Sequence, residues 1–147
     1  MQHPVGLVSQ SRPDTCWAAS IAMLINFRDG TDYGDLDVAN SYPHTREGAM
    51  PDDWQNLAVH HRLDLHQGQC LGPDDWERTL ASGPAIVVIP GKAWHAVVVS
   101  GAESDGTAEG SRIYVEDPGG GERWWDYPTF TLNYEAAAEN PVNLLTL

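Results

Sequence analysis

The stretch that decides the fold reads QSRPDTCW at residues 10–17 and continues as AASIAMLINF at residues 18–27. Alanine, methionine and leucine favour helix, and apolar side chains recur at steps of three and four. The sequence therefore predicts a buried helix from Cys16 to Phe27. Asp14 is the expected N-cap of this helix, and Gly30 is expected to end it.

Cys16 falls in the first turn of that predicted helix. Unpaired backbone N–H groups and the helix dipole at this end favour a thiolate over a thiol. A small buried core cysteine is the alternative, because cysteine is among the most buried residue types. A nucleophilic thiolate also needs a base, a group that orients the base and donors for the oxyanion, so the rest of the chain decides between the two.

Two later segments supply candidates for these partners. His95 opens the apolar run HAVVVSG at residues 95–101, which is typical of a buried strand. In SRIYVEDP at residues 111–118, strand alternation places Asp117 on the inward face with Val115, while Glu116 points the other way. A buried acid needs a cationic partner, and imidazolium is the obvious one. Asp117 could instead begin an Asp-Pro-Gly turn.

Taken in order, these motifs resemble a known family. Gln-x5-Cys-Trp, the run GPAIVV at residues 83–88, His95-Ala96-Val97 and a strand ending in Asp117 are similar to papain-like cysteine peptidases. The resemblance is greater to the compact bacterial branch, which includes double-glycine bacteriocin-processing peptidases and papain-like secreted effectors. It implies an α+β, two-lobed fold in which an N-terminal nucleophile helix packs against a mainly antiparallel β-sheet.

The resemblance also implies roles for individual residues. Cys16 would be the nucleophile, and His95 the general base and later the general acid. Asp117 would orient the imidazole, where papain itself uses asparagine. Gln10 would donate its side-chain amide to the oxyanion beside the backbone N–H of Cys16; the alternative for Gln10 is a surface loop residue.

Several tryptophans are candidates for lining or covering this site. Trp17 and Trp94 are assigned to substrate binding, since each adjoins a proposed catalytic residue in sequence. Either Trp124 or Trp125 could shield the contact between His95 and Asp117 from water. Core packing is the alternative for Trp94, Trp124 and Trp125, because large aromatic side chains commonly fill cores.

The remaining elements are expected to complete one domain over residues 1–147. Helices are predicted where proline and acidic residues begin a segment, and strands where apolar residues run between turn residues. The predicted elements are a helical turn at Asp35–Asn40, helices at Pro51–His61 and Pro73–Ala81, and strands at Ala85–Ile89, Ala93–Ser100, Arg112–Glu116, Glu122–Asp126 and Val142–Thr146.

Composition limits the partners. The chain has 8 basic and 21 acidic residues and a net charge of −13, which disfavours nucleic acids and anionic membranes. No apolar run is long enough to span a membrane and no signal peptide is recognisable. The histidines around His60 and Cys70 follow no common zinc spacing, so no metal and no cofactor are predicted.

The function that follows is a cysteine peptidase that hydrolyses protein or peptide bonds through a Cys-His-Asp triad and a thioester. The resemblance suggests cleavage after small residues such as Gly-Gly. The context expected is a bacterial effector or toxin domain, cytoplasmic in its producer, delivered by a secretion system and held by an immunity protein. The alternatives are a peptidoglycan amidase or glutamine deamidase with the same triad, and a catalytically silent binding module.

Overall fold

A computed structural model describes residues 1–42, 51–89, 95–135 and 142–147. Its elements, in chain order, are α1 (Cys16–Asp29), α2 (Asp35–Ser41), α3 (Pro51–His61), β1 (Asp64–Gln69), α4 (Pro73–Thr79), the 3-10 turn η1 (Leu80–Ser82), β2 (Ala85–Ile89), β3 (His95–Glu103), β4 (Arg112–Asp117), β5 (Gly121–Asp126), α5 (Tyr127–Phe130), the π-helical turn η2 (Thr131–Glu135) and β6 (Val142–Thr146).

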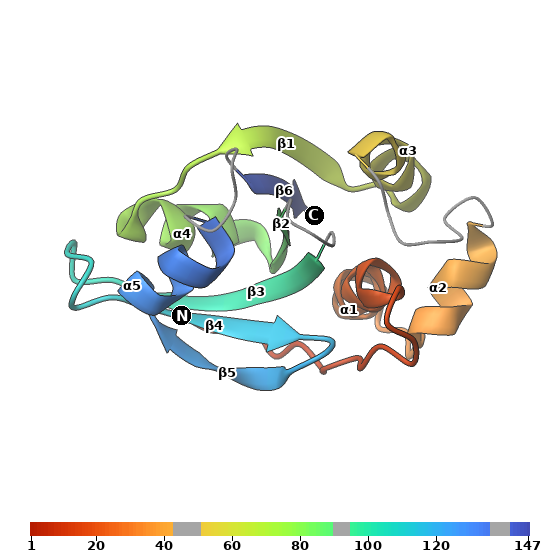
Figure 1. The fold of residues 1–147 in the computed structure, drawn as a ribbon, viewed down its shortest axis with the longest axis horizontal. Helices are drawn as coiled ribbons and strands as arrows, with labels where there is room; N and C mark the ends of the chain where they lie inside the picture. Colours follow the sequence, from red (N-terminus) through yellow and green to blue (C-terminus); the bar gives the residue numbers. More distant parts are fainter. Residues whose placement is uncertain (43–50, 90–94, 136–141) are drawn as a thin grey trace.

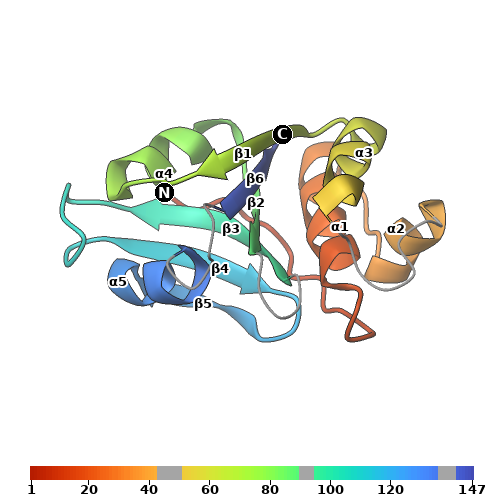
Figure 2. The same ribbon diagram turned by 45° about the horizontal axis from the view of Figure 1, so that its top comes forward.

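The six strands form one sheet in the order β1-β6-β2-β3-β4-β5, and every neighbouring pair is antiparallel. Strands β3, β4 and β5 follow one another along the chain, whereas β6 lies between β1 and β2. In Figures 1 and 2, α1, α2 and α3 gather on one side of the molecule, and α4 and α5 lie on the other. The predicted α+β class and antiparallel sheet are confirmed.

Both faces of the sheet are buried at its central strand β2, which explains why every residue of β2 is apolar and buried. Ile86 and Val88 face α1, while Val87 joins Trp76 and Phe130 in a second core on the opposite face. Successive residues of a strand point to opposite faces, so one short apolar run serves two cores. Helix α1 is in turn buried from Cys16 to Ile25, because the sheet and the other helices surround it.

Most predicted elements occur close to their expected bounds. Helix α3 and strands β2 and β6 have the predicted limits, and Gly30 ends α1 in the left-handed conformation with φ of 68°. Strand β1 and the turns at residues 127–135 were not predicted. No helix within the described residues is long and apolar enough to cross a membrane.

Candidate active site

Helix α1 places Cys16 at its first residue, where the side chain is 6% exposed. No disulfide joins this buried cysteine to the exposed Cys70. The N-cap position is occupied by Thr15, so the prediction of Asp14 as N-cap is wrong. The physical reason is a tertiary contact: the Thr15 hydroxyl donates to the carboxylate of Asp35 at 2.7 Å, which fixes the chain at the start of the helix.

Asp35, the first residue of α2, holds the loop that leads to Cys16. Its Oδ2 atom accepts from the backbone N–H and the hydroxyl of Ser11, each at 2.7 Å, as well as from Thr15. Burial acts to raise the pKa of Asp35, but these hydrogen bonds outweigh it and keep the pKa below its ordinary value. In the sequence, Asp35 is only the start of a predicted helical turn, because a partner 24 residues away leaves no local signal.

His95 begins β3 and Asp117 ends β4, and the structure brings them together. The Nε2 atom of His95 lies 3.0 Å from Oδ1 of Asp117. That contact leaves Nδ1 as the ring nitrogen available to the thiol. Hydrogen bonds with Asp117 and with Cys16 raise the pKa of His95 to about 10, against the opposing effect of burial. The ring is therefore held as a cation between two acidic groups.

The carboxylate of Asp117 is fixed by the glycine turn that follows it. Oδ1 also accepts from the backbone N–H of Gly119 at 2.9 Å. Burial acts to raise the pKa of Asp117, and the hydrogen bonds from His95 and Gly119 lower it below its ordinary value. The sequence offered two roles for Asp117, and the structure shows both. Asp117 contacts His95, and it also begins the Asp-Pro-Gly turn.

The same turn contacts the loop that carries Gln10. The backbone N–H of Gln10 donates to the carbonyl of Pro118 at 3.0 Å, and its side-chain Nε2 donates to the carbonyl of Arg12 at 2.9 Å. A Cβ added at Gly119 would lie 3.1 Å from Oε1 of Gln10, so glycine permits this close approach. A hollow of about 590 Å³ between residues 9–13 and 118–121 has Gln10 in its wall.

Tyr134 is a neighbour of the site that sequence reasoning missed. Its side chain is 6% exposed, and burial together with the charge of Asp117 and a hydrogen bond to it raises the pKa of Tyr134 to about 12. Trp125 packs edge-on against Tyr134 with ring centres 5.6 Å apart. The aromatic that adjoins Asp117 is therefore a tyrosine. Trp125, one of the two tryptophans considered for shielding the site, contacts that tyrosine.

The two tryptophans assigned to substrate binding have different outcomes. Trp17 is 2% exposed and belongs to the core around α1, so almost none of its surface can meet a substrate. Trp94 lies outside the described residues. Among the described residues, no group of three or more His, Cys, Asp or Glu side chains could hold a metal ion.

Comparisons with known proteins identify the family and the fold of the chain. A family model described as papain-like cysteine protease AvrRpt2 matches residues 2–135. No curated protein matches the chain. Two solved structures share its fold. The crystal structure of a double glycine motif protease from an AMS/PCAT transporter, in complex with the leader peptide, has a TM-score of 0.65 and 19% identity, covering 99% of this chain and 93% of that one.

The second is the peptidase domain of Streptococcus ComA, a bi-functional ABC transporter involved in a quorum sensing pathway. Its TM-score is 0.68 at 16% identity, and the alignment covers 98% of both chains. The predicted papain-like fold is thereby confirmed. With the family model spanning nearly all of the described sequence, the chain belongs to the papain-like cysteine protease family and is a cysteine peptidase.

Proposed function

We propose that residues 1–147 form one peptidase domain that hydrolyses peptide bonds with Cys16 as nucleophile, His95 as base and acid, and Asp117 as the group that orients His95. The observation that carries this proposal is the contact of His95 with Asp117 at 3.0 Å on one side and with Cys16 on the other. Nucleophile, base and orienting acid then form one hydrogen-bonded series, as nucleophilic catalysis requires.

The reaction follows from the positions of these groups. The Cys16 thiolate attacks the carbonyl carbon, and the negative charge moves to the carbonyl oxygen. The backbone N–H of Cys16, which lies in the first turn where the helix supplies no acceptor, and the Nε2 of Gln10 donate to that oxygen. His95 gives its proton to the departing amine, which leaves a thioester on Cys16.

In the second half of the reaction, His95 acts as a base instead of an acid. His95 takes a proton from water, the resulting hydroxide attacks the thioester carbon, and the acid product leaves as the Cys16 thiolate returns. Asp117 keeps the imidazole in place through both transfers and stays ionised throughout. A peptide substrate is supported by the double glycine motif protease, whose structure contains a leader peptide. We propose that small residues such as Gly-Gly precede the cleaved bond.

The test is cleavage of peptides with and without a Gly-Gly pair, followed by mass spectrometry. We expect the protein to cut the Gly-Gly peptides, Cys16→Ala to leave only background, and the matched Cys70→Ala to stay fully active. Gln10→Ala should lose about 10²- to 10³-fold in kcat, the cost of one oxyanion donor. Glutamine-to-glutamate conversion without cleavage would establish a deamidase instead, and equal activity of Cys16→Ala would refute the proposal.

The biological context stays a prediction: an effector or toxin domain, delivered by a bacterial secretion system and held by an immunity protein. Producing the domain inside bacteria tests it. We expect growth to slow with the intact site and to recover with Cys16→Ala at equal protein level. Equal growth of the two cultures would contradict a toxic role without affecting peptidase activity on peptides.

A further inference from the structure

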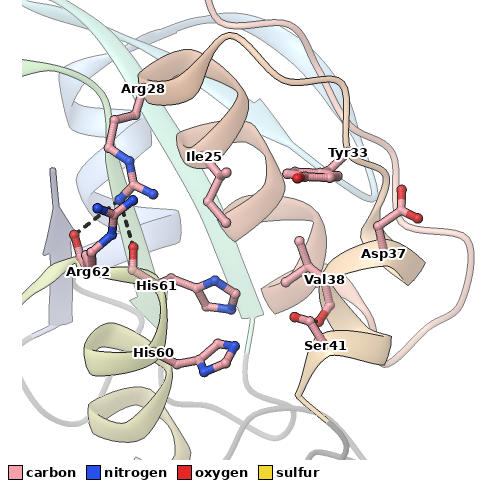
Figure 3. A pocket seen from close by; sticks show the side chains of 9 residues that line it. All are labelled: Ile25, Arg28, Tyr33, Asp37, Val38, Ser41, His60, His61 and Arg62. Carbon is pink, nitrogen blue, oxygen red and sulfur yellow. Dashed lines mark hydrogen bonds between the residues drawn. The ribbon is translucent and has the colours of Figure 1, made fainter.

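A second concave site lies on the helical side of the molecule, away from the catalytic groups. It has a volume of about 340 Å³ and is bounded by the later part of α1, by α2 and its preceding loop, and by the end of α3 (Figure 3). Its lining residues are Ile25, Arg28, Tyr33, Asp37, Val38, Ser41, His60, His61 and Arg62. Ile25 and Arg28 lie on the same helix as Cys16, roughly 14 to 18 Å further along its axis.

The first observation that points to a ligand is His61. Its side chain is 9% exposed, and among the described residues its Nε2 atom has no hydrogen-bond partner. Figure 3 shows its ring directed into the pocket, beside the ring of His60. Burial, followed by the charges of His60 and Arg28, lowers the pKa of His61 to about 4, so the imidazole is neutral at neutral pH. A buried polar nitrogen without a partner is costly unless a bound group satisfies it.

The second observation is the sign of the charge around this ring. Arg28 donates to the carbonyl of His61 at 2.7 Å, and its guanidinium also pairs with the two carboxylate oxygens of Asp29, at 2.8 and 2.9 Å, outside the lining. The acidic residue of the lining, Asp37, accepts from the backbone N–H of Gly34 at 2.8 Å, and Figure 3 shows its carboxylate turned away from the histidine rings. The lining therefore holds two cations, Arg28 and Arg62, and one anion, Asp37, although the whole chain carries −13.

The third observation is the apolar part of the pocket. Ile25 and Val38 form one surface, and the half-exposed ring of Tyr33 borders it with its hydroxyl end toward Ile25 (Figure 3). His60 and His61 stand opposite, with ring centres 4.7 Å apart. A mostly apolar cavity with a few convergent polar groups is typical of small-molecule sites, and the volume suits a ligand of about one ring.

We propose that this pocket binds a small aromatic carboxylate. Its ring would lie on Ile25 and Val38 beside Tyr33. Its carboxylate would accept a hydrogen bond from Nε2–H of His61, in a lining that also holds Arg28 and Arg62. The site is distinct from the catalytic groups, and the proposal holds whether or not the chain cleaves peptides.

The test uses benzoate as the probe, with the full chain carrying Cys16→Ala so that catalysis has no influence. Calorimetry gives affinity, and NMR follows the imidazole protons of all six histidines at constant ionic strength. We expect benzoate to bind and to shift the His60 and His61 signals. Acetate, which lacks the ring, and benzyl alcohol, which lacks the charge, should each bind about tenfold more weakly or worse.

Variants locate the binding. His61→Phe keeps a ring of similar size and should weaken benzoate about tenfold or more, as expected for loss of a hydrogen bond to a charged group. Since a buried change can disturb folding, Tyr33→Ala at the exposed rim provides a second test. It removes the ring beside the ligand and should weaken binding by a few-fold. The matched control is His66→Phe, at an exposed histidine of β1 outside the pocket.

Three outcomes would overturn the proposal. These are benzoate leaving His60 and His61 unshifted, benzyl alcohol binding as tightly as benzoate, or His66→Phe weakening binding as much as a folded His61→Phe.

Discussion

The protonation of His95 in β3 depends on side chains from two other elements, α1 and β4. Its ring lies between the carboxylate of Asp117 and the thiol of Cys16, and these contacts raise its pKa to about 10. The pKa is higher in the folded protein than in the unfolded chain, so the imidazolium stabilises the fold fully below about pH 6.5. That contribution is lost as the pH rises toward about 10.

The charge and the orientation supplied by Asp117 can be separated with two substitutions. Asp117→Ala removes both, so we expect the His95 pKa to fall toward 6.5 and kcat/KM to fall about 10²- to 10⁴-fold. Asp117→Asn lowers the pKa as well, but its amide oxygen still accepts from Nε2–H. It should keep at least about tenfold more activity than the alanine variant. NMR titration of His95 and peptide kinetics measure the two effects, and equal activity of the variants would show that orientation contributes nothing.

Among the elements, strand β4 carries an unexpected buried acid next to the site. Glu116 is 1% exposed, and Ser100 of β3 donates to its Oε1 at 2.6 Å. The strand parity predicted from the sequence holds, because Glu116 pairs with Val98 and points opposite to Val115. Its burial was not predicted. Burial, partly offset by the Ser100 hydrogen bond, raises the pKa of Glu116 to about 7.

This acid should make stability depend on pH. The folded protein keeps the Glu116 proton up to about pH 7, whereas the unfolded chain releases it near pH 4.5. The folded state therefore binds more protons in this interval, and the free energy of unfolding decreases by about 3 kcal/mol as the pH rises through it. Glu116→Gln should remove that decrease and be the more stable protein at pH 8.

Urea unfolding of the unmodified protein and of Glu116→Gln at several pH values gives the difference between their free energies of unfolding. The contributions of the other titrating groups cancel in this difference. Glu109→Gln, at an exposed loop residue, is the matched control and should follow the unmodified protein. A constant offset between the Glu116→Gln and unmodified curves from pH 4 to 8 would contradict the shifted pKa.

The elements also show why sequence patterns succeed in some places and fail in others. Helix α3 and strand β2 were predicted with their observed limits because proline, acidic residues and apolar runs act locally. Strand β1, with the sequence DLHQGQ, has no apolar alternation and exists through its pairing with β6. The capping of α1 depends on a contact with Asp35. The contact of Tyr134 with Asp117 depends on the packing of residues 127–135. Local sequence carries neither contact.

At the scale of the whole molecule, helix α1 shares its core with β6, which is distant from it in the sequence. Leu145 of β6 is fully buried in the core that contains Cys16, Ile86 and Val88. Leu145→Ala should lower the free energy of unfolding by about 2 to 5 kcal/mol, through lost burial and the cavity that remains. Peptidase activity should then disappear at a correspondingly lower urea concentration.

Leu132→Ala is the matched control for this change, since that leucine is 67% exposed. Its effect should stay within about 0.5 kcal/mol. Similar losses for the two variants would show that β6 contributes no specific support to the nucleophile helix.

The position of β6 also has a consequence for the order of folding. Strands β3, β4 and β5 pair with neighbours in sequence, so they can associate through short loop closures. β6 must instead reach strands far back in the chain and enter between β1 and β2, and contacts of large sequence separation form slowly. We expect the strands that carry His95 and Asp117 to pair early, and the helix that carries Cys16 to reach its final packing only when β6 is inserted. Assembly of the catalytic groups would then be one of the last events in folding.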